Sequence, residues 1–135
     1  MVVRTLIIQK DCTIAIGYRE VTQEELDFLK THKTELNIAQ LSVFIHTIEE
    51  IKELFKTKID SLTSSYLKTI YNIHFEITSN GYKYELKKDN KSVFIIKCET
   101  NMGCTDFILE KNGQILTYLD PKDNNLNRAI MNRIL

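Results

Sequence analysis

The sequence is poor in residues that interrupt or cross-link a fold. Its 135 residues include one proline, four glycines, three cysteines and no tryptophan. So little proline and glycine leaves no candidate linker between domains, and the 43% share of hydrophobic residues excludes a disordered chain. A chain of this length buries enough surface to fold without disulfide bonds. We therefore expect a single ordered domain over residues 1–135.

The sequence also lacks an excess of either charge and any long hydrophobic run. Eighteen basic residues balance eighteen acidic ones, so no overall field attracts a nucleic acid or an anionic membrane. No segment approaches the roughly 20 apolar residues of a membrane helix, and the apolar run after Thr5 is too short for a signal peptide. We expect a cytoplasmic protein that binds neither nucleic acid nor membrane. In that compartment Cys12, Cys98 and Cys104 remain thiols.

Three helices are predicted from their ends and their periodicity. Thr22 with Glu25 and Thr47 with Glu50 are capping boxes, which mark the first turns of helices. The first helix is expected to stop near Asn37, and the second has a break near residue 61. A third helix is predicted near the carboxyl terminus, with Asp120 as its N-cap, followed by proline and by apolar residues at helical spacing.

The remaining apolar runs predict strands. Residues 2–8 and 13–18 are expected to form a hairpin, and residues 41–46 a third strand. Farther along, Asn80-Gly81, Asp89-Asn90 and Asn112-Gly113 suit two-residue hairpin turns, because these residue types tolerate positive φ angles. With a five-residue loop at 99–103, these turns predict a five-strand meander.

The four predicted turns define two apolar rows across the meander. The expected rows are Phe75, Leu86, Val93, Leu109 and Leu116, and Ile77, Tyr84, Ile95, Phe107 and Tyr118. A one-residue slip in any turn would send the side chains of a strand to the other face. The predicted fold class is α+β: a mainly antiparallel sheet with a five-strand C-terminal meander, two capped helices on one face and a C-terminal helix.

Two cysteines flank the predicted loop 99–103. In the expected register Cys98 lies opposite Cys104, at a separation that a disulfide can span. Plain buried thiols are nevertheless the preferred interpretation, because cytosolic cysteines stay reduced. A zinc site needs about four ligands, and the expected register places His74 roughly 20 Å from Cys98 along the strands. We therefore expect no metal and no cofactor.

Residues with catalytic chemistry are sparse. The sequence has no phosphate-binding glycine loop and no metalloprotease motif, and its histidines have no nucleophile at a recognisable spacing. Tyr82, Lys83 and Tyr84 alternate between the two faces, which excludes a stacking platform for nucleic acid. Glu76 and Glu85 are expected to lie opposite each other. One alternative function is therefore a small enzyme or ligand-binding domain with a site near Glu76, Glu85 and His74.

The second face of the predicted meander changes from polar to apolar halfway across. Either the terminal helix or the N-terminal hairpin covers the apolar half, or that half is an exposed patch for another protein. The missing catalytic constellation, together with this mixed apolar and charged face, favours a non-catalytic intracellular protein that binds and occludes a partner, as inhibitors and immunity proteins of toxins do. The expected anchors are Phe94, Ile96 and Ile108, and the expected rim residues are Lys83, Glu85 and Asp106.

Overall fold

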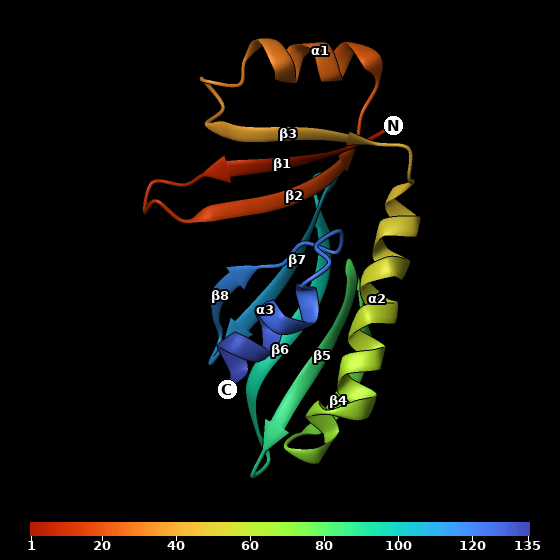
Figure 1. Cartoon of the computed structure of the whole chain (residues 1–135), viewed down its shortest axis with the longest axis vertical. Coiled ribbons are helices and arrows are strands. Elements are labelled where there is room, and N and C mark those ends of the chain that lie inside the picture. The colour runs from red at the N-terminus through yellow and green to blue at the C-terminus, as the bar shows by residue number, and fades with distance from the viewer.

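The chain folds around one antiparallel sheet of eight strands, to which three α-helices and one short 3-10 helix are added (Figure 1). The computed structural model describes residues 1–135. None of the helices is long and apolar enough to cross a bilayer. In chain order the elements are β1 (Val2–Ile8), β2 (Ile14–Glu20), α1 (Gln23–Thr31), β3 (Ile38–Phe44), α2 (Ile48–Ser65), η1 (Leu67–Thr69), β4 (Asn72–Thr78), β5 (Gly81–Lys88), β6 (Lys91–Asn101), β7 (Cys104–Lys111), β8 (Gln114–Tyr118) and α3 (Leu126–Ile134).

Strand β7 connects the two halves of the sheet. The strand order is β3-β1-β2-β7-β6-β5-β4, and β8 also pairs with β7. Along the edge of β7 that faces away from β6, residues Thr105 and Asp106 pair with β2, and residues 108–111 pair with β8. The two partners of that edge therefore diverge, and the β1–β2 hairpin projects away from β8 (Figure 1).

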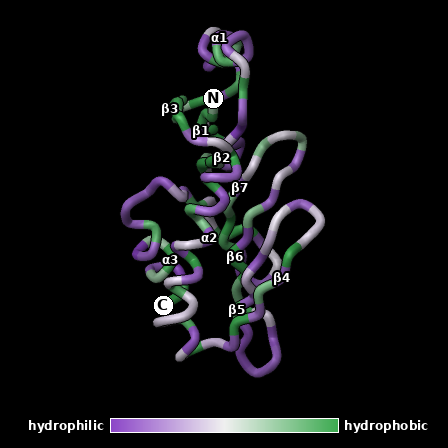
Figure 2. The backbone as a smooth tube through the Cα atoms, turned by 90° about the vertical axis from the view of Figure 1, so that its right-hand side faces the viewer, coloured by the Kyte–Doolittle hydropathy of each residue, from purple (hydrophilic) through white to green (hydrophobic).

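The helices lie on two different faces of the sheet. Successive residues of a strand point to opposite faces, so Val2 and Val3 of β1 identify the two sides. Val2 belongs to the main core, together with residues of α2 and α3. Val3 belongs to a small second cluster, together with Leu26 of α1. Figure 2 accordingly shows α1 at one end of the molecule, beyond β1 and β3 and far from α3.

The main core forms where α2 crosses the meander. Phe55 of α2 packs on Phe107 of β7, with 4.6 Å between ring centroids, and both side chains are fully buried. Two tyrosines of β5 form hydrogen bonds with α2. Tyr82 donates its hydroxyl to the carbonyl of Lys52 at 2.7 Å, and Tyr84 donates to the carboxylate of Asp60 at 2.6 Å.

The predicted α+β class, the meander and both capped helix starts are confirmed. Thr22 accepts a hydrogen bond from the backbone of Glu25 and completes its capping box, and Thr47 accepts one from the backbone of Glu50. Two details differ from the prediction. The helix that shares a face with α2 is α3 and not α1, and the third strand begins at Ile38, before the predicted residue 41.

The predicted apolar rows are wrong from β4 onward. Phe75 lies opposite Tyr84 and not Leu86, and Ile77 lies opposite Tyr82 and not Tyr84, although this two-residue shift leaves the faces unchanged. A bulge after Leu86 shifts the pairing of β5 with β6 by one residue, so Leu86 lies opposite Phe94 and not Val93. The loop after β6 is a tight turn at Met102 and Gly103, and not five residues long. A second bulge shifts the pairing of β7 with β8. The two bulges and the shorter loop each displace the pairing by an odd number of residues, which exchanges the two faces of a strand.

The tight turn at Met102 and Gly103 also separates the two cysteines. Cys98 lies opposite Phe107 in the main core, whereas Cys104 lies opposite Asn101 on the other face of the sheet. Both are free thiols. Burial raises the pKa of Cys98 to about 12 and that of Cys104 to about 11. The predicted facing pair is therefore wrong, and the preferred interpretation as plain thiols holds.

The N-cap predicted for the third helix is wrong as well. Helix α3 begins at Leu126, and Asp120 lies in the connection before it. The Asp120 carboxylate accepts hydrogen bonds from Arg4 Nη1 at 2.6 Å and from the Tyr18 hydroxyl. This long-range ion pair holds the C-terminal connection against β1 and β2.

Candidate functional site

The face of β4–β7 that lies opposite α2 carries the largest group of charged side chains in the fold. We call it the open face, because no helix of either hydrophobic cluster packs on it. Strand pairing places acidic and basic residues next to one another there, and five ion pairs connect them. The charged residues of the open face are Glu76, Lys83, Glu85, Lys87, Lys97, Glu99, Asp106 and Glu110.

Lys83 and Lys97 are the centres of this network. Lys83 Nζ lies 3.3 Å from Glu85 and 3.6 Å from Glu76. Lys97 Nζ lies 2.5 Å from Glu110 and 3.3 Å from Glu99. The Lys97 and Glu110 side chains are only 22% and 14% exposed, so they pack on the sheet and do not extend into water. The network therefore presents a charge pattern with little freedom to rearrange.

The ion pairs keep these groups charged. Partial burial of Glu85 acts to raise its pKa, but the hydrogen bond and charge of Lys83 outweigh burial and lower that pKa below its usual value. Burial of Lys97 acts to lower its pKa, and the hydrogen bond with Glu110 raises the pKa instead. Such shifts stabilise the ionised forms of both the carboxylate and the lysine.

Asp106 is the exception on the open face. It lies opposite Glu99, and no lysine or arginine forms an ion pair with it. Burial raises the pKa of Asp106 above its usual value, and the charge of Glu99 adds to the increase. The hydrogen bond from the Cys104 thiol, at 3.6 Å, and the charge of Arg19, which forms no ion pair with Asp106, oppose this shift without reversing it. Asp106 is thus a carboxylate that a cation from another molecule would stabilise.

The residues predicted as binding anchors are placed differently. Phe94 and Ile96 lie in the main core beneath α2, on the face opposite Lys83 and Glu85. Ile108 lies on the open face, but it is 2% exposed between Lys97 and Tyr118 in the pairing. Of the two alternatives, an exposed apolar patch at these three positions is therefore wrong, and Phe94 and Ile96 are covered within a core that includes residues of α2 and α3. The predicted rim residues Lys83, Glu85 and Asp106 do share one face.

The residues of the alternative enzymatic site also lie on the open face. His74 pairs with Glu85, and Glu76 pairs with Lys83, so Glu76 and Glu85 are not directly opposite as predicted. Lys83 lies between the two carboxylates and neutralises them. None of the four main cavities is lined by these residues. No specific observation therefore favours catalysis here.

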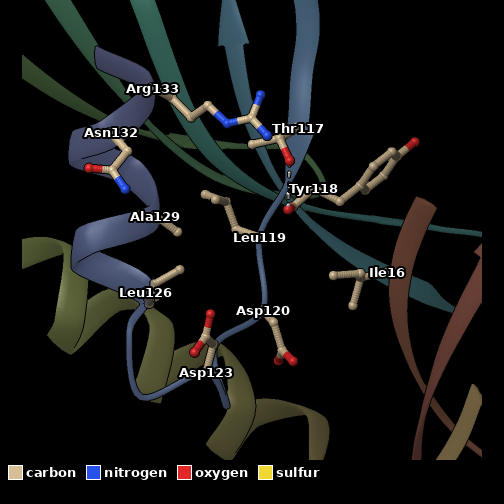
Figure 3. Close-up of a pocket in the computed structure, with 10 residues that line it drawn as sticks. All are labelled: Ile16, Thr117, Tyr118, Leu119, Asp120, Asp123, Leu126, Ala129, Asn132 and Arg133. Carbon is tan, nitrogen blue, oxygen red and sulfur yellow. Dashed lines mark hydrogen bonds between the residues drawn. The ribbon is translucent and has the colours of Figure 1, made fainter. Parts of the chain in front are cut away.

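The largest of these cavities lies elsewhere, in the fork between β2 and β8. It measures about 660 Å³ and is lined by the β1–β2 hairpin, β8 and Arg133 of α3. A second cavity of about 290 Å³ continues it toward Asp120 and shares Ile16, Tyr118 and Arg133 (Figure 3). We call the two together the fork cleft. No pattern in the sequence predicts this cleft, because it depends on where β2 and β8 leave β7.

No protein-family model, no curated protein and no solved structure matches this chain at a significant level. Its function is therefore inferred from its own surfaces.

Proposed function

We propose that this protein is a non-catalytic intracellular binding module that inhibits a partner protein, an enzyme or a toxin, by occluding its working surface. The supporting observation is the ordered array of ion pairs on the open face. A sheet face without a helix, and with fixed charges of both signs, suits recognition of a complementary charged surface.

The ion pairs order the charged side chains of the open face before a partner arrives, and this favours binding there. Ordering a long charged side chain on association costs about 0.5–1.5 kcal/mol, and the ion pairs of Lys83 and Lys97 reduce that cost in advance. Asp106 adds an unpaired carboxylate in the same face. A basic side chain of the partner that reaches Asp106 would relieve its repulsion with Glu99.

Charge reversal tests the proposal. The protein is used to capture partners from its native cells, and the variants Lys83→Glu and Asp106→Lys are compared with the wild type. Close charge pairs across interfaces couple by about 1.5–7 kcal/mol, so each variant should weaken the captured complex by about tenfold or more. The purified partner is then assayed for its own activity with and without the protein.

Matched controls reverse charges away from the open face. Lys68 on η1 and Asp27 on α1 are exposed, and Lys68→Glu and Asp27→Lys should leave capture unchanged. Circular dichroism verifies that all four variants are folded. Equal capture by the Lys83 and Asp106 variants and the wild type would remove the open face from consideration, and a partner whose activity is unaffected would contradict inhibition.

A further inference from the structure

The fork cleft combines exposed apolar side chains from both of its walls. Ile14 projects from the β1–β2 hairpin, and Ile115 and Leu116 project from β8. These side chains are between 36% and 51% exposed, and Ile8, beside Ile14 in the hairpin, is similarly exposed. An apolar surface of this kind, divided between two facing walls, is typical of a site that receives another chain.

Strand edges without partners border the same cleft. Strand β8 pairs only with β7, so its outer edge is bonded to no strand. Strand β2 pairs with β7 only at Gly17 and Tyr18, which leaves the edge of residues 14–16 free as well. Unpaired strand edges offer backbone donors and acceptors that an extended peptide can use.

The β8 edge is less protected than the two outer edges of the sheet. At one end of the sheet, β3 lies beside α1 (Figure 1), with Leu41 packed against the α1 cluster. At the other end, β4 carries His74 and Glu76, and charged residues discourage strand addition. Strand β8 has the sequence QILTY, which contains neither a charged residue nor a proline. Its exposed edge is therefore open to pairing.

Arg133 supplies a charge at the centre of the cleft. It lines both cavities, and in Figure 3 its guanidinium extends from α3 toward Thr117 and Tyr118. None of the ion pairs in the fold includes Arg133. A guanidinium binds a carboxylate with two parallel hydrogen bonds when one is offered. Three acidic residues, Asp11, Asp120 and Asp123, also line the two cavities and would repel a strongly acidic occupant. The cleft thus suits an occupant with a single carboxylate opposite Arg133.

From these observations we propose that the fork cleft binds an extended segment of another protein that carries one carboxylate and adds as a strand to the outer edge of β8. Alternate side chains of the segment are apolar and contact Ile14 and Leu116, and a carboxylate of the segment pairs with Arg133. This inference goes beyond the proposed function, because it concerns a different surface, and either can fail without the other.

The dimensions favour a single strand over a second copy of the chain. The five residues of β8 span roughly 17 Å, the length of an ordinary strand. The cavity of about 660 Å³ lies in the range of pockets that hold small ligands or short peptide segments. In a pair of copies joined through β8, each copy would bring its own hairpin and α3 to the junction, where they would compete for the same space.

The test uses a displayed library of random linear peptides selected against the folded protein. Peptides that bind the wild type should carry one Asp or Glu at a constant position and should alternate apolar with polar residues. Their affinity should fall at least tenfold for Leu116→Lys and for Ile14→Lys. The matched control is Ile77→Lys on β4, which replaces an apolar residue that is 78% exposed outside the cleft.

Two further measurements identify the binding mode. N-methylation of alternate amides in a selected peptide should abolish binding in one of the two registers only, because an added strand bonds through every second residue. For Arg133→Glu the selected peptides should carry a basic residue in place of that carboxylate. Peptides that bind the three variants like the wild type, that tolerate methylation in both registers, or that fail to enrich at all would overturn the proposal. A dimer that sedimentation detects and that Leu116→Lys dissociates would overturn it in favour of a second copy.

Discussion

The Asp120→Ala substitution tests how the two ends of the chain are joined. The Asp120 carboxylate accepts hydrogen bonds from Arg4 of β1, from Tyr18 of β2 and, at 2.9 Å, from the backbone N–H of Lys122. The Arg4 and Asp120 side chains are 17% and 16% exposed. Removal of the carboxylate leaves the Arg4 guanidinium mostly buried and without its counter-charge.

The expected loss of stability is large for a single substitution. Breaking a buried ion pair by removal of one partner costs about 3–5 kcal/mol, and the residual exposure of this pair places the expectation near the lower end. Arg4 retains a hydrogen bond to Ser42 at 3.2 Å and a cation–π contact with Phe44. We expect the free energy of unfolding to fall by about 3 kcal/mol, which corresponds to a decrease of about 10 °C in Tm.

Denaturant unfolding of a double-mutant cycle measures the effect. The cycle combines Asp120→Ala with Arg4→Met, and the double variant should be more stable than Asp120→Ala alone, because it buries no unpaired charge. Tyr18→Phe is the matched control, since it removes only one hydrogen bond and should cost about 1 kcal/mol. A cost of less than about 1 kcal/mol for Asp120→Ala, with additive single effects, would refute the role assigned to this ion pair.

Three further predictions follow from the same structure. Gly81→Ala should cost about 3 kcal/mol in a denaturant titration, because its new Cβ would lie 1.9 Å from the Cys98 carbonyl oxygen, and an unchanged midpoint would contradict that close approach. Exposed Cys12 should react with a thiol reagent much faster than Cys98, whose raised pKa and burial suppress the thiolate, and equal rates in native protein would count against the packing. Burial and hydrogen bonds to carboxylates raise the pKa of Tyr18 and of Tyr84, so the folded state keeps protons that the unfolded chain releases above about pH 10. These two tyrosines should therefore leave the free energy of unfolding unchanged below that pH and lower it above. Tyrosinate absorbance and the unfolded fraction should rise together in an alkaline titration. Ionisation of both phenols while the protein is still folded would disprove this.

Local signals in the sequence predicted most of the elements. The caps at Thr22 and Thr47 and the turn at Asn112 act within a few residues, and each is found where it was predicted. The pairing next to the last turn, Lys111 with Gln114, also follows from the turn alone. These features depend on short-range geometry, which the sequence specifies directly.

Long-range features were not predictable in the same way. The bulges after Leu86 and at Leu109 each add one extra residue to a strand, which exchanges its faces, and the turns on either side do not predict them. Asp120 accepts a local hydrogen bond from the Lys122 backbone, as an N-cap would, but α3 begins only at Leu126, and the same carboxylate pairs with Arg4, 116 positions away in sequence. Neither effect has a signature within a short window of sequence.

The shifted register also changes where a partner can find apolar contacts. In the predicted register Phe94 and Ile96 were surface anchors next to Lys83, whereas the observed bulge buries both beneath α2. The open face is thereby left with charges and no exposed large anchor, so binding there depends on electrostatic complementarity and should weaken steeply with salt. The exposed apolar side chains Ile14 and Leu116 lie instead in the fork cleft, where binding should depend much less on salt. The salt dependence of a captured complex therefore distinguishes the two surfaces before any residue is changed.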